Sequence, residues 1–234
     1  MRFEQPLVEG TLKARSNRFV AEVELESGEA VSARCANPGS MLGVSEPGSK
    51  VLLSVHDDPR RKFQHQLEII YSGRTPVGVH TGRPSHVITE ALQQGLIPEL
   101  AGYAKMRREV QFNRDSKISI LLEGNGLRPC YVEVLNVTLA DNETALFPDA
   151  PEDKMIDRMV ELTDLVREGN RAMVIYLAQR LDVERFRPAD HIDPEYGQAF
   201  RDAVARGVET LGFRARVSRQ GIEFDERLIM DLEL

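Results

Sequence analysis

The chain has 234 residues, a net charge of −7, 41% apolar and 29% charged residues, values typical of a globular protein with one large domain or two small ones. It contains no run of 18 apolar residues and no apolar segment after Met1, which argues against a membrane span or a secretion signal and predicts a cytoplasmic protein. Cys35 and Cys130 lie far apart without metal-ligand spacing, which predicts buried free thiols rather than a disulfide or a zinc site.

Charge is distributed unevenly along the chain. Residues 1–80 hold 10 Lys and Arg against 10 Asp and Glu, whereas residues 81–234 hold 20 against 27. Because the location of charge matters more than its sum, any nucleic-acid interface is expected in the N-terminal part. The candidate contacts to phosphate there are Arg15, Asn17, Arg18, Arg60, Arg61 and Lys62. For each of the basic residues the alternative is a solvated surface side chain.

Short strands dominate the first 80 residues. They are expected at 8–14, 18–25, 30–35, 50–55, 66–71 and 77–80, where apolar and polar residues partly alternate. Turn signals such as Asn37-Pro38-Gly39 separate them. Strands at this spacing, without helical periodicity between them, predict a small closed barrel such as an OB-fold, with a small open sandwich as the alternative.

A helical pattern follows the strands. Residues 84–94 place apolar side chains at 87, 88, 91 and 92 and end before Gly95. Further strands are expected at 107–112, 117–122, 129–139, 172–178 and 208–217, and further helices at 153–168 and 194–206. This alternation predicts an α/β domain with a mixed sheet. The change in pattern near residue 82 divides the chain into predicted domains 1–82 and 83–234.

The strand at 130–139 carries the first indication of a site. Because successive side chains of a strand point to opposite faces, Val132 and Val134 share one face while Glu133 and Leu135 share the other. A carboxylate among apolar neighbours in an interior strand is costly unless it has a partner. The alternative is an edge strand with Glu133 in water.

Several blocks along the chain resemble the sugar fermentation stimulation protein family. They are NRFV at 17–20, CANPGSM at 35–41, EPGS at 46–49, ITEAL at 88–92, REV at 108–110, YVEVLNVTL at 131–139, FPDA at 147–150 and IDP at 192–194. The resemblance covers nearly the whole chain. It implies an N-terminal OB-fold, a second domain of the PD-(D/E)xK nuclease fold, and DNA binding linked to the regulation of sugar metabolism.

The nuclease motif of that family is incomplete in this chain. In that nuclease fold, hydrolysis of a phosphodiester needs a divalent metal ion held by carboxylates and a lysine close to the attacked phosphate. The family's metal-binding aspartate corresponds to Ser119, and the lysine of its Glu-Val-Lys corresponds to Leu135. Glu133 and Glu109 remain as remnants of the catalytic set, and Glu133 with Asp149 would hold metal if any binds. We therefore expect lost catalysis, with Glu133 paired to a residue such as Lys117 or more readily protonated.

Three functions remain open at this point. The first is a non-enzymatic DNA-binding regulator without a cofactor. The second is an active nuclease that uses Mg²⁺ or Mn²⁺ and relocated groups, namely Lys117, Asp149, Glu152, Asp153 and Lys154. The third is a pseudoenzyme that binds a small molecule or a protein. DNA is the expected partner, and no association with a membrane is expected. Formation of a homodimer is left open.

Overall fold

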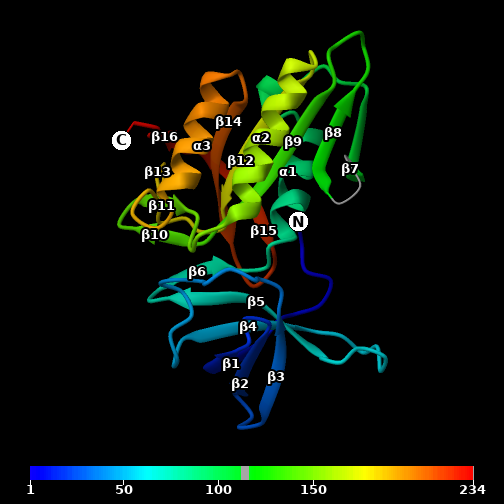
Figure 1. The fold of residues 1–234 in the computed structure, drawn as a ribbon. Helices are drawn as coiled ribbons and strands as arrows, with labels where there is room; N and C mark the ends of the chain where they lie inside the picture. The colour runs from blue at the N-terminus through cyan, green and yellow to red at the C-terminus, as the bar shows by residue number, and fades with distance from the viewer. Residues whose placement is uncertain (112–115, 234) are drawn as a thin grey trace.

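The computed structural model describes residues 1–111 and 116–233, which form a β-barrel and an α/β domain stacked on it (Figure 1). Residue 112, the predicted end of the strand at 107–112, lies outside the described residues. No helix of the described part is both long enough and apolar enough to cross a membrane.

The N-terminal strands close a barrel. They are β1 (Val8–Ser16), β2 (Val20–Leu25), β3 (Ala30–Cys35), β4 (Lys50–Val55) and β5 (His65–Ser72), and β6 (Thr75–Gly78) pairs with β5. Neighbours in the order β3-β2-β1-β4-β5 are antiparallel, and a parallel pairing of β3 with β5 closes the ring. The predicted closed barrel is therefore confirmed, and the open sandwich is excluded.

Alternate side chains of these strands fill the barrel interior, where Leu12, Val23 and Leu53 are almost fully buried. Gly10 lets β1 approach β2 closely. A Cβ atom at this position would lie 2.5 Å from Val23 Cγ1 and 2.8 Å from the carbonyl oxygen of Glu24. The barrel can therefore close tightly here only because position 10 has no side chain.

The second domain is built on a mixed sheet. Its elements are α1 (Arg83–Gln93), the 3-10 helix η1 (Pro98–Leu100), β7 (Lys105–Gln111), β8 (Lys117–Glu123), β9 (Cys130–Val137), α2 (Asp153–Arg167), β12 (Arg171–Ala178), α3 (Pro194–Ala205), β14 (Glu209–Val217) and β15 (Ile222–Arg227). The strand order is β15-β14-β12-β9-β8-β7. The neighbours β9, β12 and β14 run parallel, and the outer pairings are antiparallel. The predicted α/β domain with a mixed sheet is confirmed.

Strand β9 lies inside this sheet, between β12 and β8, so the edge-strand alternative is wrong. Val132 and Val134 pack in a cluster with Ile88 of α1. On the opposite face Leu135 packs in a cluster with Leu162 of α2. Helices α2 and α3 cover this second face, as Figure 1 shows. The predicted division of the β9 side chains between two faces is confirmed, and it directs Glu133 toward the side of α2.

A small second sheet was not predicted. It consists of β10 (Leu139–Asp141), β11 (Thr144–Phe147), β13 (Arg185–Pro188) and β16 (Ile229–Met230), in the order β10-β11-β13-β16. The predicted strand at 129–139 is interrupted at Thr138, and its last residue belongs to β10. Strands of two to four residues are too short for alternation to reveal them. Cys35 and Cys130 are buried free thiols, as expected.

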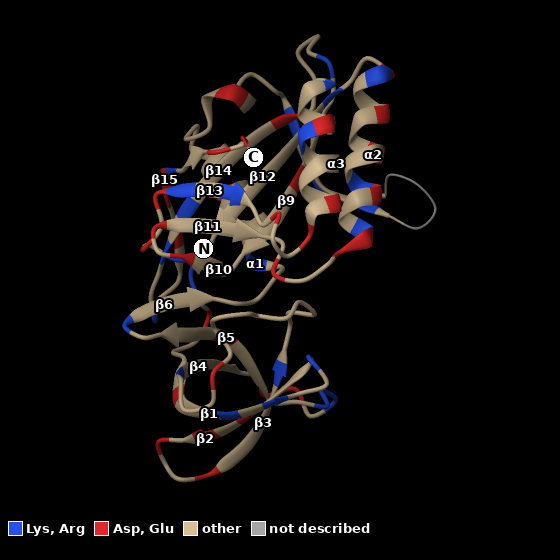
Figure 2. Cartoon of the chain, turned by 60° about the vertical axis from the view of Figure 1, so that its left-hand side comes forward, with Lys and Arg blue, Asp and Glu red and all other residues tan. Residues whose placement is uncertain are grey.

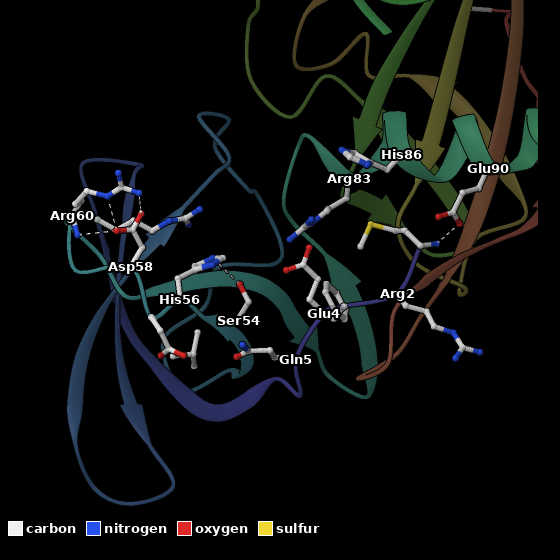
Figure 3. Close-up of a pocket in the computed structure, with 15 residues that line it drawn as sticks. Arg2, Glu4, Gln5, Ser54, His56, Asp58, Arg60, Arg83, His86 and Glu90 are labelled. Atoms are coloured by element: carbon white, nitrogen blue, oxygen red, sulfur yellow. Dashed lines mark hydrogen bonds and ion pairs between the residues drawn. The ribbon is translucent and has the colours of Figure 1, made fainter. Parts of the chain in front are cut away.

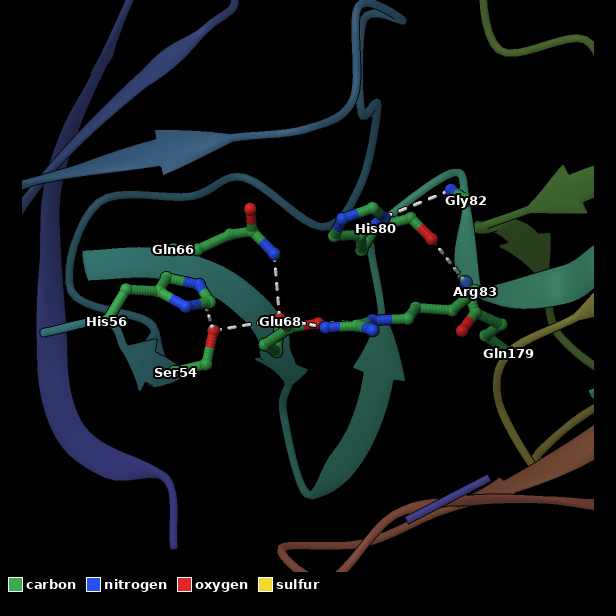
Figure 4. Close-up of polar contacts among 8 residues, drawn as sticks. All are labelled: Ser54, His56, Gln66, Glu68, His80, Gly82, Arg83 and Gln179. Carbon is green, nitrogen blue, oxygen red and sulfur yellow. Dashed lines mark hydrogen bonds and ion pairs between the residues drawn. The ribbon is translucent and has the colours of Figure 1, made fainter. Parts of the chain in front are cut away.

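A buried ion pair joins the barrel to the second domain (Figure 4). Glu68 of β5 is fully buried, and its carboxylate accepts hydrogen bonds from Arg83 Nε at 3.0 Å and from Arg83 Nη2 at 2.5 Å. Ser54 Oγ and Gln66 Nε2 each donate to the same carboxylate at 2.9 Å. Burial by itself raises the pKa of Glu68, but the hydrogen bonds and charge of Arg83 outweigh it and hold this pKa below its ordinary value. Since Arg83 begins α1, the pair fixes the start of this helix against the barrel.

Gln179 forms another part of the junction, directly after β12. Its side chain is fully buried, and Nε2 donates to Asn136 Oδ1 at 2.6 Å and to the carbonyl oxygen of His80 at 3.3 Å. The backbone carbonyl oxygen of Gln179 accepts a hydrogen bond from the Gly78 amide at 2.8 Å. A Cβ atom at position 78 would lie 2.7 Å from Gln179 Oε1, so the close approach of β6 requires glycine.

Residues 1–3 pack on the second domain before the chain enters the barrel. The Met1 amine donates to the carbonyl oxygen of Ile222 at 2.6 Å and pairs with Glu90 at 2.7 Å. Arg2 forms an antiparallel bridge with Gly221. The barrel is consequently connected to the second domain at both of its ends.

Candidate functional site

Glu133 lies in the interior of the sheet and is 8% exposed. Arg158 of α2 places its Nε atom 3.6 Å from Glu133 Oε2. At this distance the pair is electrostatic, and neither Glu133 Oε2 nor Arg158 Nε has a hydrogen-bond partner in the described part of the chain. Burial raises the pKa of Glu133 to about 7, although the charge of Arg158 and hydrogen bonding from Ser119 act in the opposite direction.

The position of Arg158 is set by two further contacts. Its Nη1 donates to Glu161 Oε2 at 2.7 Å, and its Nη2 donates to the carbonyl oxygen of Lys117 at 3.0 Å. The Lys117 side chain is exposed. The partner of Glu133 is therefore Arg158, not Lys117, and the cation beside the carboxylate comes from a helix and not from the adjoining strand.

The other positions of the expected catalytic set do not complete a metal site. Ser119 Oγ accepts a hydrogen bond from the Val134 amide at 3.0 Å, and Leu135 is buried in the apolar cluster under α2. Glu109 is exposed on the outer strand β7, at a backbone φ of 50°. Among residues 1–111 and 116–233, no three His, Cys, Asp or Glu side chains are grouped so that they could hold a metal ion. Of the expected set, the described structure therefore keeps Glu133 as a single buried carboxylate beside Arg158.

Asp149 is engaged in holding the barrel against the second domain. Its Oδ2 accepts a hydrogen bond from the Met41 amide at 2.6 Å, and its carbonyl oxygen accepts one from Ser40 Oγ at 2.5 Å. Both donors belong to the loop that follows β3. This loop, strand β9 and Phe147 border a cavity of about 250 Å³, whose wall includes Leu135 and Asp149. The sequence blocks at 35–41, 131–139 and 147–150 thus meet at the domain junction.

Gly39 gives a direct test of this contact. A Cβ atom at Gly39 would lie 2.8 Å from Asp149 Oδ1 and 3.0 Å from Asn37 Oδ1. We expect Gly39→Ala to lower the free energy of unfolding by about 1–3 kcal/mol, as overpacking at close contacts typically does. Urea denaturation of Gly39→Ala, Asp149→Ala and the double variant measures it. If the contact exists, Gly39→Ala should lower the free energy of unfolding less in the Asp149→Ala background, because the Asp149 oxygens are gone. Strictly additive losses would contradict the contact.

A second candidate site lies on the outside of the barrel, where a group of Lys and Arg segments lies beside β3 (Figure 2). A cavity of about 380 Å³ is lined there by Phe19, Arg34, Arg61, Lys62 and Phe63, which we call the basic–aromatic surface. Phe19 is 58% exposed, and Lys62 Nζ lies 5.2 Å from the centre of the Phe63 ring. Within the described residues no carboxylate oxygen lies within 4.0 Å of the charged nitrogens of the three basic side chains.

The predicted phosphate contacts divide into two groups. Arg61 and Lys62 belong to the basic–aromatic surface. Arg15 donates to the carbonyl oxygens of four residues at 2.7–2.9 Å and so organises the loop after β3. Arg60 is paired with Asp58, while Asn17 and Arg18 occupy the turn between β1 and β2 with positive φ angles of 52° and 59°. The structure thus brings two of the six residues together in one cavity, beside three that were not predicted.

The cleft between the barrel and α1 has a volume of about 770 Å³ and carries charges of both signs (Figure 3). Most of its cationic groups already have carboxylate partners. Arg60 pairs with Asp58, Arg83 pairs with Glu68, and the Met1 amine pairs with Glu90. His56 has a lowered pKa, mainly because of burial and the nearby charge of Arg61. The cleft therefore offers an anion less unpaired positive charge than the basic–aromatic surface does.

Comparison with known proteins gives consistent matches along the chain. The family model of the SfsA N-terminal OB domain matches residues 14–79, and that of the sugar fermentation stimulation protein RE domain matches residues 82–221. A sugar fermentation stimulation protein homolog of Geobacter metallireducens is 45% identical over 229 residues, covering 97% of this chain and 98% of the relative. The homolog of Geobacter sulfurreducens is 42% identical and covers 96% of each chain.

A solved structure, that of Pyrococcus furiosus SfsA in complex with Ca²⁺, superposes with a TM-score of 0.89. The two sequences are 24% identical, and the match covers 99% of this chain and 98% of the other. The arrangement of a barrel followed by an α/β domain is therefore shared over the whole length. At this level of identity the similarity concerns the fold.

Proposed function

Since the chain belongs to the sugar fermentation stimulation protein family, we propose that it is a cytoplasmic DNA-binding regulator of sugar metabolism whose second domain does not cleave DNA. The observation that carries the proposal is the basic–aromatic surface. Its Arg34, Arg61 and Lys62 have no carboxylate partner among the described residues, so their charge is available to phosphate. The net charge of −7 does not oppose this, because the three cations are clustered on the barrel.

Loss of cleavage is supported by the surroundings of Glu133. Arg158 already lies beside this carboxylate, Leu135 fills the position of the family's lysine, and Ser119 offers a hydroxyl where a carboxylate is needed. A single buried carboxylate whose charge is already opposed by an arginine offers Mg²⁺ less negative charge than a pair of carboxylates does. The Ca²⁺ of the Pyrococcus furiosus complex is a property of that protein. A corresponding ion in this chain would need further ligands beside Glu133.

DNA binding is tested by fluorescence anisotropy at two salt concentrations. The variant that combines Arg34→Ala, Arg61→Ala and Lys62→Ala should bind a DNA oligonucleotide at least about tenfold more weakly. The slope of log K against log salt should be smaller by about 2 to 3, since each lost phosphate contact removes roughly 0.7 to 0.9. The matched control combines Lys13→Ala, Lys50→Ala and Arg60→Ala, which removes three cations of the same barrel that are paired with carboxylates. Equal losses in both triple variants, or no binding at low salt, would contradict the proposal.

Cleavage is tested separately, with purified protein, plasmid and linear DNA, and either Mg²⁺ or Mn²⁺. We expect no products above those of a Glu133→Ala preparation purified in the same way. Metal-dependent cleavage that disappears in Glu133→Ala would overturn this half of the proposal while leaving DNA binding untouched.

A further inference from the structure

We infer that the basic–aromatic surface takes unpaired bases of single-stranded DNA, with Phe19 and Phe63 as stacking partners and Arg34, Arg61 and Lys62 as phosphate contacts. The inference rests on the proposed DNA-binding function and specifies the form of DNA that this surface prefers. It follows from where the two rings lie, from how firmly they are held, and from the charges around them.

The cavity is formed by three separate segments of the barrel. Phe19 comes from the turn between β1 and β2, Arg34 from β3, and Arg61, Lys62 and Phe63 from the loop between β4 and β5. In OB-folds the outer face of the second and third strands and these two loops form the surface that meets oligonucleotides. The cavity of about 380 Å³ lies within the range of sites for small molecules, roughly 300–1,000 Å³, so it can admit a base as well as a phosphate.

Phe19 is held in an exposed position by the backbone around it. Asn17 and Arg18 adopt positive φ angles, which form the turn, and the carbonyl oxygen of Phe19 accepts a hydrogen bond from the Cys35 amide at 2.8 Å. The ring is therefore anchored at its backbone but remains 58% exposed. A large apolar ring in water next to unpaired cations gains most from a partner that is flat, apolar on its faces and attached to anions. A nucleobase on its sugar-phosphate chain has these properties.

The loop that carries Phe63 is also ordered. Gln64 Nε2 donates to the carbonyl oxygens of Asp58 at 3.0 Å and Arg61 at 3.3 Å, and the His56 amide donates to the carbonyl oxygen of Gln64 at 2.8 Å. Lys62 Nζ lies over the Phe63 ring, 5.2 Å from its centre, so a cation that can contact phosphate stands next to a ring that can take a base. The backbone that carries each of the two rings is thus held by hydrogen bonds within the barrel.

The two rings distinguish single strands from duplex DNA. In a duplex the faces of the bases are covered by their neighbours, so the phenylalanines could reach only phosphate and sugar. In a single strand each base has accessible faces, and stacking on an aromatic side chain stabilises the complex whatever the base. Duplex DNA should therefore bind through the cations alone.

The test compares three fluorescent oligonucleotides of equal length by anisotropy: an oligothymidine strand, an abasic strand with the same phosphates, and a duplex. The wild-type protein should bind oligothymidine more tightly than the other two. Phe19→Ala and Phe63→Ala should each weaken binding of oligothymidine about 5- to 150-fold, the range expected for the loss of one stacked base, and leave the abasic strand unchanged. Leu42→Ala is the matched control, because Leu42 is a similarly exposed apolar residue, 52% exposed, outside this cavity.

A direct readout of stacking is available because the chain has no tryptophan. In Phe63→Trp the single indole should be quenched by oligothymidine and not by the abasic strand. Equal affinity of the wild type for oligothymidine and abasic strands, or an unquenched indole, overturns the inference while DNA binding stands. Failure of all three oligonucleotides to bind overturns the proposed function itself. An oligouridine strand of the same length is measured in addition, and tighter binding of this strand than of oligothymidine overturns the assignment to DNA.

Discussion

Replacement of Arg83 by methionine is expected to lower the free energy of unfolding at neutral pH by about 3–5 kcal/mol, the usual cost of leaving a buried charge without its partner. Glu68 is fully buried, and Arg83 supplies two of the hydrogen bonds that its carboxylate accepts. Methionine retains much of the side-chain volume but donates nothing. Ser54 and Gln66 remain as donors, yet neither carries a charge.

Urea denaturation measures the loss of unfolding free energy, and two further variants serve as comparisons. The double variant Glu68→Gln with Arg83→Met removes both charges and should recover a large part of the stability. Arg60→Met breaks an exposed pair with Asp58 and should have a much smaller effect, because water screens the two charges. If Arg83→Met were no worse than Arg60→Met, the pair with Glu68 would not be what holds the junction.

The same pair has a defined dependence on pH. The pKa of Glu68 is held below the ordinary value of 4.5 in the folded protein. The stability contributed by the ionised carboxylate is therefore present above the unfolded value and is lost as the pH falls through the lower folded value. In Arg83→Met the arginine no longer opposes the effect of burial, so burial favours the protonated form of the Glu68 carboxyl. The difference in stability between wild type and variant should accordingly shrink as the solution is acidified from neutral pH.

Glu133→Gln is expected to produce the opposite trend. The folded pKa of about 7 exceeds the ordinary value of 4.5, so the folded state keeps a proton that the unfolded chain releases. The stability linked to this proton is fully present below pH 4.5 and is lost as the pH rises through 7. At about 1.36 kcal/mol per pKa unit, the variant should gain about 3 kcal/mol relative to the wild type above neutral pH.

The measurement is chemical denaturation of both proteins between pH 4.5 and pH 8.5, with the difference plotted against pH. Arg158→Met is a useful companion, because removal of the cation raises the pKa of Glu133 further and extends the range over which the carboxyl stays protonated. A difference between Glu133→Gln and wild type that is flat over this range would mean that the carboxyl is not desolvated as the structure indicates.

The barrel and the mixed sheet could be predicted from the sequence because they depend on repeated local patterns, and the family could be predicted because blocks that resemble it run along nearly the whole chain. The alternation in β9 correctly separated Val134 from Leu135, and it placed Glu133 on a buried face. The partner of Glu133 could not be found in this way, since Arg158 lies on a different element. The sequence of α2 does contain an indication. Arg158 directly precedes Met159, whose side chain is buried, so Arg158 begins close to the side of the helix that faces the sheet.

The barrel surface was only partly predicted for a related reason. Basic clusters are visible in a sequence, but the partners of each cation are not. In the sequence, Arg15 and Arg60 resemble phosphate contacts. In the structure, Arg15 donates to backbone carbonyl oxygens and Arg60 pairs with Asp58. Phe19 and Phe63 lie in a turn and a loop, where no periodicity reveals their role, and only folding brings them beside Arg34.

The attachment of the barrel at both ends restricts how the two domains can move. With residues 1–3 fastened to β15 and its preceding turn, and Arg83 fastened to Glu68, the barrel has no single hinge about which to swing. A rotation of the barrel against the second domain would have to break both sets of contacts at once. These contacts oppose changes in the distance and orientation of the barrel surface relative to β9, so the direction in which a bound DNA strand would leave the barrel depends on both domains.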